Sequence, residues 1–226
     1  MTHVLDRPIW TALNSRHARL AEGGALAKRY PAAVSAFAAA GDEAPECLAA
    51  LGALATPGET LIVVQAEPIP LPEGFEATLR ATLVQMVAEE PPQPVADARI
   101  VRLGPQDAQD MLDLAVLTKP GPFTLRAQDF GPFWGIRSGG RLIAMAGQRL
   151  GQAGFRELSG VCTHPDVRGQ GLGRLMSLYG MERIREAGDV PYLHAYASNA
   201  TAIGLYESIG FRLRTTMNMA VMRRAG

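Results

Sequence analysis

The sequence predicts an α/β fold of the α+β type, in which helices flank one central mixed sheet and a smaller α/β unit comes first. Three observations lead to this prediction. Segments with strand and helix periodicity follow one another from residue 98 onward, which is typical of a layered sheet protein. A glycine-rich loop at 168–173 joins a predicted strand to a predicted helix. Apolar residues make up 47% and charged residues 19% of the chain, as in an ordinary globular protein.

The chain has 226 residues, enough for one large domain or two small ones. The clearest boundary is Glu89-Glu-Pro-Pro-Gln-Pro-Val-Ala-Asp97, where three prolines within four residues favour an extended spacer. We therefore predict an N-terminal α/β domain at 1–90, a Pro-rich linker at 91–97 and a second domain at 98–226.

The first domain carries weak element signals and no chemical motif. Loosely spaced apolar residues predict a helix over 8–21, and a better helical pattern covers 43–54. The apolar run at 60–66 predicts a strand, and 79–88 is rich in β-compatible residues.

The second domain shows a regular order of elements. A short strand at 98–103 precedes a helix that begins at Gly104-Pro-Gln-Asp107 and ends at Lys119-Pro-Gly-Pro122. The elements predicted next are a loop or short helix at 124–130, a hairpin of strands 133–137 and 141–150, and a strand at 155–163. The last ones are a helix reaching about residue 187, a strand at 190–197, a helix at 198–209 capped by Ser198 or Asn199, and one long or two short strands at 211–222.

Charge and composition exclude several function classes. Lysine and arginine number 22, as do aspartate and glutamate, so the chain lacks the basic footprint of a nucleic-acid binder. Cys47 and Cys162 stand far apart with no ligand spacing around them, so we expect neither a disulfide nor a metal site. No run of 18 apolar residues and no signal peptide occur, so we expect a soluble cytoplasmic protein without a membrane partner. We expect a monomer or a homodimer.

The loop at 168–173 has the composition of a phosphate site. Gly169, Gly171 and Gly173 alternate where a helix begins, and each glycine costs about 1 kcal/mol there relative to alanine. Bare backbone N–H groups at a helix N-terminus bind anions, which accounts for that cost. The loop lacks the Lys-Ser or Lys-Thr of a P-loop and the glycine period of a dinucleotide site.

Two motifs resemble those of the GNAT N-acetyltransferase superfamily. Arg168-Gly-Gln-Gly-Leu-Gly173 fits the acyl-CoA loop [RQ]-x-x-G-x-[GA], and Asn199-Ala-Thr-Ala-Ile-Gly-Leu-Tyr-Glu-Ser-Ile-Gly-Phe211 fits N-x-x-A-x-x-L-Y-x-x-x-G-F. The resemblance covers about residues 98–223 and implies a splayed central sheet. The segment Thr118-Lys-Pro-Gly-Pro-Phe123 further resembles the glycine N-acyltransferase-like subgroup, which implies that residues 1–90 are a degenerate copy of the same fold.

The resemblance implies acetyl-CoA as the co-substrate. Its pyrophosphate would meet the backbone of Gly169, Gln170, Gly171, Leu172 and Gly173, with charge from Arg168 and Arg174. For Arg174 a solvated surface residue is an equal alternative. The pantetheine arm would pair with the main chain of Val161 and Thr163, and an N–H near Val161 or Cys162 would polarise the thioester carbonyl.

Catalytic candidates also follow from the motifs. Tyr206 stands where many family members carry the tyrosine that protonates the leaving thiolate, and Asn199 would cap its helix and contact pantetheine. Glu157 and His194 are alternative bases for the amine, with a water relay as a third possibility. Cys162 lacks an activating partner, which favours a packing role.

We therefore expect an N-acyltransferase that moves an acetyl group to a primary amine by direct attack in a ternary complex. The alternatives are a CoA-binding sensor or scaffold without catalysis, and an interaction module at 1–90 attached to the GNAT unit. The acceptor amine cannot be identified from the sequence. Its site is expected in the N-terminal half and at 120–133, where apolar side chains line a cleft or pack in the core: Pro122, Phe123, Phe130, Phe133 and Trp134.

Overall fold

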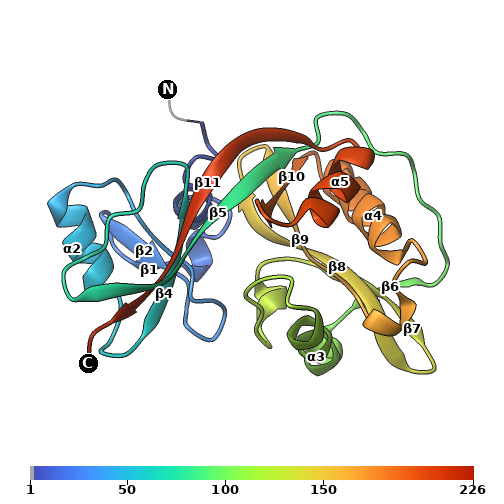
Figure 1. The fold of residues 1–226 in the computed structure, drawn as a ribbon, viewed down its shortest axis with the longest axis horizontal. Helices are drawn as coiled ribbons and strands as arrows, with labels where there is room; N and C mark the ends of the chain where they lie inside the picture. The colour runs from blue at the N-terminus through green and yellow to red at the C-terminus, as the bar shows by residue number, and fades with distance from the viewer. Residues whose placement is uncertain (1–2) are drawn as a thin grey trace.

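Two long antiparallel strands, β5 (Phe75–Val87) and β11 (Arg212–Arg224), run through both lobes of the molecule (Figure 1). The computed structural model describes residues 3–226. The two strands pair from Val87 opposite Arg212 to Phe75 opposite Arg224. They belong to an eight-stranded sheet of order β4-β11-β5-β10-β9-β8-β7-β6, which therefore continues from one lobe into the other.

The N-terminal lobe adds short elements to one end of this sheet. A three-stranded sheet of order β1-β2-β3 packs beside β4, and α2 covers it. The elements are α1 (Pro8–Leu13), η1 (Ala18–Leu20), β1 (Glu22–Gly23), β2 (Ala27–Arg29), β3 (Ala38–Ala40), α2 (Pro45–Ala53) and β4 (Thr60–Gln65).

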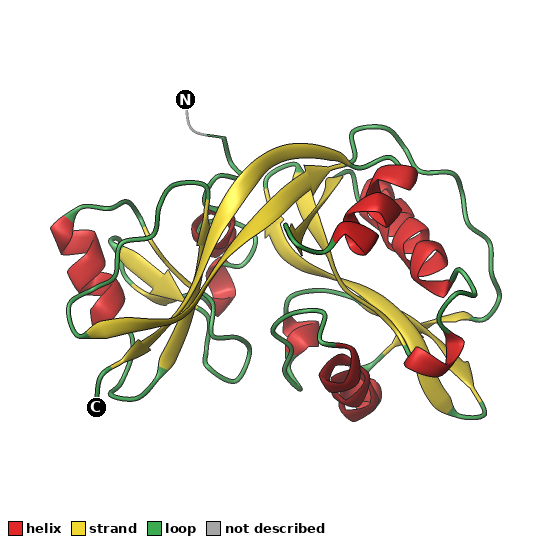
Figure 2. Cartoon of the chain, viewed as in Figure 1, coloured by secondary structure: helices red, strands yellow, loops and turns green. Residues whose placement is uncertain are grey.

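The C-terminal lobe places helices on both faces of the sheet (Figure 2). Side chains of α4 pack on one face with Leu158, and side chains of α3 pack on the other with Met145. Because both faces are covered, residues 142–148 of β8 are all buried. The elements are β6 (Ile100–Leu103), η2 (Pro105–Asp107), α3 (Ala108–Thr118), η3 (Ala127–Asp129), β7 (Phe133–Ser138), β8 (Arg141–Gln152), β9 (Phe155–Thr163), η4 (Pro165–Val167), α4 (Leu172–Glu186), β10 (Val190–Tyr196) and α5 (Ala200–Ser208).

Most predicted elements are confirmed within a few residues, and the main differences lie in the N-terminal half. The helix predicted over 8–21 ends at Leu13, because Asn14 Nδ2 and Ser15 Oγ donate back to the carbonyls of Trp10 and Thr11 and compete with further helix. Strand β5 begins at Phe75, before the predicted segment at 79–88. The three short strands β1, β2 and β3 were not predicted.

The segment predicted as a linker forms no helix or strand between residues 91 and 97. It runs around the outside of the C-terminal lobe, from the end of β5 to β6 (Figure 1). Strand β5 itself lies between β10 and β11, so the sheet spans the predicted boundary. Among the described residues, no helix combines the length and the apolar character that crossing a membrane requires.

Candidate active site

The strands β9 and β10 diverge at the centre of the sheet. They pair in parallel only from Phe155 opposite Val190 to Glu157 opposite Tyr192. Beyond that point β9 continues to Thr163 along β8, while β10 continues to Tyr196 along β5. The predicted splay is therefore present, and it leaves a wedge bordered by two strand edges that do not bond to each other.

A bulge in β9 shapes this wedge. Ser159 pairs with Gly147 and Cys162 with Met145, so two residues of β9, Gly160 and Val161, face a single position on β8. Gly160 has φ +61°, and a Cβ there would lie 2.8 Å from the Phe133 ring. Only glycine fits, because a side chain would meet both the strained φ and the ring.

The predicted glycine loop lies at the start of α4. Gly169 and Gly171 have φ of +79° and +75°, and Gly171 is the N-cap residue of the helix. A Cβ at either glycine would meet no atom within 4 Å, so their backbone geometry, rather than crowding, requires glycine. Arg168 and Arg174 are exposed, and neither forms an ion pair within residues 3–226. Free N–H groups, a helix dipole and two available cations meet here, as an anion site requires.

Helix α5 brings two predicted residues to the wedge. The Asn199 side chain accepts a hydrogen bond from the Ala202 amide at 3.1 Å, which confirms the predicted cap. Tyr206 packs edge-on against Phe211 with 5.7 Å between ring centroids. Burial, with a smaller contribution from Cys162, raises the pKa of Tyr206 to about 12. The raised pKa keeps its hydroxyl protonated at neutral pH, and the hydroxyl has no hydrogen-bond partner among the described side chains and main-chain groups.

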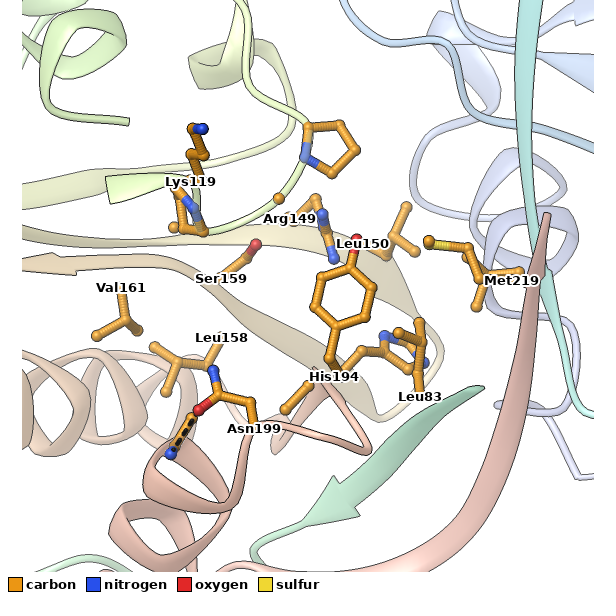
Figure 3. Close-up of a pocket in the computed structure, with 18 of the residues that line it drawn as sticks. Leu83, Lys119, Arg149, Leu150, Leu158, Ser159, Val161, His194, Asn199 and Met219 are labelled. Atoms are coloured by element: carbon orange, nitrogen blue, oxygen red, sulfur yellow. Dashed lines mark hydrogen bonds between the residues drawn. The ribbon is translucent and has the colours of Figure 1, made fainter. Parts of the chain in front are cut away.

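A cleft joins this wedge to the N-terminal lobe (Figure 3). Val161, Asn199 and Tyr206 line one part of it, and His194 lines the region between the lobes. The structure thus brings together predicted residues from β9, β10 and α5. The other lining side chains come mainly from both lobes and the 118–122 loop, and they include Ile9, Phe37, Val64, Leu83, Lys119, Pro122, Arg149, Leu150, Ser159, Tyr196 and Met219.

Cys162 and Thr163 do not line the cleft with their side chains. Cys162 is 2% exposed, and burial raises the pKa of its thiol to about 12 despite a hydrogen bond with Thr118. A thiol in this state is a poor nucleophile, which agrees with the predicted packing role.

Glu157 is fully buried and bound from several sides. Its carboxylate accepts hydrogen bonds from Arg149 Nε at 2.8 Å and Nη2 at 2.7 Å, and from the Leu150 amide at 3.3 Å. Burial alone would raise the pKa of Glu157, but Arg149 and His194 outweigh it and hold that pKa well below its ordinary value. The result is an ionised carboxylate with little basicity.

His194 is held in a single tautomer. Arg214 can only donate, so it fixes Gln85 Oε1 as its acceptor, and the Gln85 amide nitrogen then donates to the Leu5 carbonyl and to His194 Nε2, both at 2.9 Å. Nε2 must therefore carry the lone pair. The ring proton sits on Nδ1 and is donated to Glu157 Oε1 at 2.8 Å.

Of the aromatic residues considered for the acceptor cleft, Phe130, Phe133 and Trp134 belong to the core, and Phe123 packs against it. Pro122 lines the cleft, but Phe123, Phe130, Phe133 and Trp134 do not. Phe130 packs on Tyr30, Phe123 packs on Phe133, and Trp134 packs on Tyr179. Part of the apolar lining comes from N-terminal residues such as Phe37 and Val64, which no sequence signal separates from ordinary core positions.

The chain matches one protein-family model and is similar to several solved structures. The FR47-like protein family matches residues 133–220. A protein assigned to the GNAT family from Novosphingobium aromaticivorans is 38% identical over all of both chains, with a TM-score of 0.93. A GCN5-related N-acetyltransferase from Kribbella flavida is 18% identical and shares the fold, with a TM-score of 0.67 over 100% of this chain and 97% of the other.

Similarity to curated proteins is local. A mycothiol acetyltransferase from Nocardiopsis dassonvillei is 43% identical over 54 residues, 23% of this chain and 16% of the other. A second, from Thermomonospora curvata, is 36% identical over 74 residues, 32% of this chain and 25% of the other. The matched segments span a quarter or less of these curated relatives.

Proposed function

The chain belongs to the GNAT family of acetyltransferases, and from this premise we propose that it transfers an acetyl group from acetyl-CoA to a primary amine by direct attack within a ternary complex. One observation carries the proposal: the wedge between β9 and β10 opens beside Tyr206, and the glycine loop stands at its end. We further propose a likeness to glycine N-acyltransferase-like proteins, on the segment 118–123 that resembles that subgroup.

The residues around the wedge fit acetyl-CoA. The N–H groups of 169–173 and the side chains of Arg168 and Arg174 would hold its phosphates. The main chain of Val161, Cys162 and Thr163, on the edge that β10 leaves unpaired, would hold the pantetheine arm. When bound, acetyl-CoA supplies an acetyl group activated as a thioester.

Tyr206 serves as the general acid in this proposal. Its raised pKa, about 12, keeps the phenol protonated throughout the physiological pH range. Tyr206 lines the cleft, and its hydroxyl has no described hydrogen-bond partner. A protonated phenol at that place can donate to the thiolate as it leaves.

Of the two candidate bases, His194 is better suited than Glu157 to accept the proton of the amine. Glu157 holds the proton of Nδ1 and thereby keeps the lone pair on Nε2, so it acts as a positioning residue. Gln85 occupies Nε2 in this structure, and proton uptake, directly or through water, therefore exchanges that hydrogen bond.

Release of free thiol from acetyl-CoA tests the activity. The protein is incubated with acetyl-CoA and a panel of amino acids, alkylamines and polyamines, and thiol is measured against a reaction without amine. Amine-dependent release is expected for at least one class. Release that no amine accelerates, in a protein that also fails to bind acetyl-CoA, would contradict the proposal.

A further inference from the structure

The end of the cleft away from the wedge is apolar. Leu83, Leu150 and Met219 lie on the opposite side of the cleft from Asn199 and Val161 (Figure 3). Ile9 and Phe37, which also line the cleft, belong to the same hydrophobic cluster as Leu83 and Met219. An acceptor that reaches this end and buries an apolar group there therefore gains binding free energy from the hydrophobic effect.

The charges that line the cleft are of one sign. Lys119 and Arg149 are cationic, and no Asp or Glu side chain is among the lining residues of the described chain. Glu157 forms an ion pair with Arg149, but its carboxylate is fully buried and does not line the cleft. A second ammonium group, as in a polyamine, would therefore find no partner in this cleft.

Arg149 presents a fixed donor edge. Nε and Nη2 are held by Glu157, and the guanidinium stacks on Phe37 with 5.0 Å from Cζ to the ring centroid. Nη1 has no acceptor among residues 3–226, and it points toward the 118–122 loop, where a Cβ on Gly121 would lie 4.0 Å away. Lys119, exposed at the start of the same loop, is the other cationic residue that lines the cleft. Such an arrangement is suited to a carboxylate.

From this juxtaposition we propose that the acceptor is an amino acid with an apolar side chain. Its carboxylate binds Arg149 Nη1, and its side chain packs against Phe37, Leu83 and Met219. The proposal rests on the acetyltransferase function above and specifies its acceptor. Simple alkylamines would leave the Arg149 donors unpaired, whereas polar amino acids would leave the apolar end unfilled.

Calorimetry on the CoA-loaded protein tests this directly. The probes are L-leucine, L-leucinamide, 3-methylbutylamine, which has the leucine side chain without the carboxylate, and L-aspartate. Leucine is expected to bind at least about tenfold more tightly than each of the others, because each lacks one of the two contacts. Equal affinity for 3-methylbutylamine, or no binding of leucine, would overturn the proposal.

A charge reversal at Lys119 provides a second test of the proposed acceptor. Lys119→Glu should weaken leucine binding by about tenfold and improve binding of 1,4-diaminobutane, since the cleft then offers an anion. Arg19→Glu makes the same change of net charge on an exposed residue outside the cleft and should alter neither affinity. Equal effects of the two variants would count against the site. Thiol release with amines other than amino acids would leave the acetyltransferase function standing while this acceptor class fails.

Discussion

At the scale of single residues, the hydrogen bonds of His194 define its chemistry. Gln85→Glu replaces a donor by an acceptor, so that acceptors then face both ring nitrogens. We expect the wild-type ring to carry its proton on Nδ1 and the variant ring to become an imidazolium that cannot accept a proton from the amine. Nitrogen-15 NMR of the ring distinguishes these states at pH 7. A variant ring that stays neutral would refute the assignment.

The role of Tyr206 can be separated from packing. Tyr206→Phe removes a hydroxyl that has no described partner, so the midpoint of thermal unfolding should change little. We expect kcat to fall by about 10²-fold, the lower range for a general acid, while KM for acetyl-CoA is unchanged. Because the pKa of Tyr206 is raised to about 12, the wild type should show no loss of activity from this group up to about pH 11. Unchanged turnover in the variant would remove Tyr206 from the mechanism.

Glu157 contributes stability as well as position. Glu157→Gln should cost about 3–5 kcal/mol in the free energy of unfolding, because the largely buried Arg149 charge loses its anionic partner. Asp166→Asn, which breaks the exposed pair with Arg141, should cost less than about 1 kcal/mol. Urea unfolding measures both.

The pH dependence of that stability has a definite sign. The folded-state pKa of Glu157 lies below the ordinary value of 4.5, so its contribution is present above that value and is lost as pH falls through the folded-state pKa. Glu157→Gln should therefore weaken the acid-induced loss of stability in the wild type. If Glu157→Gln and Asp166→Asn lowered the free energy of unfolding equally at pH 7, the pair of Glu157 with Arg149 would not be a source of stability.

At the scale of elements, local signals were sufficient to predict the loop, cap and strand that form the proposed donor site. The alternating glycines, the Asn199 cap and the strand before the loop each carry their geometry in a few neighbouring residues. Local patterns do not encode register between distant segments, so the insertion of β5 between β10 and β11 was not predicted. Gln85 reaches His194 only through that insertion, and the tautomer was for this reason outside the reach of sequence reasoning.

At the scale of the whole molecule, we propose that residues 1–90 build the acceptor end of the cleft rather than an attached module. Removing them deletes β4 and β5, and β10 and β11 then lose their common neighbour. A chain starting at residue 91 should fail to show cooperative unfolding by circular dichroism. A folded and fully active remainder would instead support a separable interaction module.

The account depends most directly on acetyl-CoA binding at the glycine loop. Calorimetric titration should show saturable binding to the wild type and a loss of at least tenfold in Gly171→Val, whose side chain is incompatible with φ of +75° at the start of α4. Gly154→Val, with φ of +77° in the turn between β8 and β9, imposes the same strain away from the loop and should bind as the wild type does. Absence of binding to the wild type, or equal affinity in Gly171→Val, would contradict the central claim.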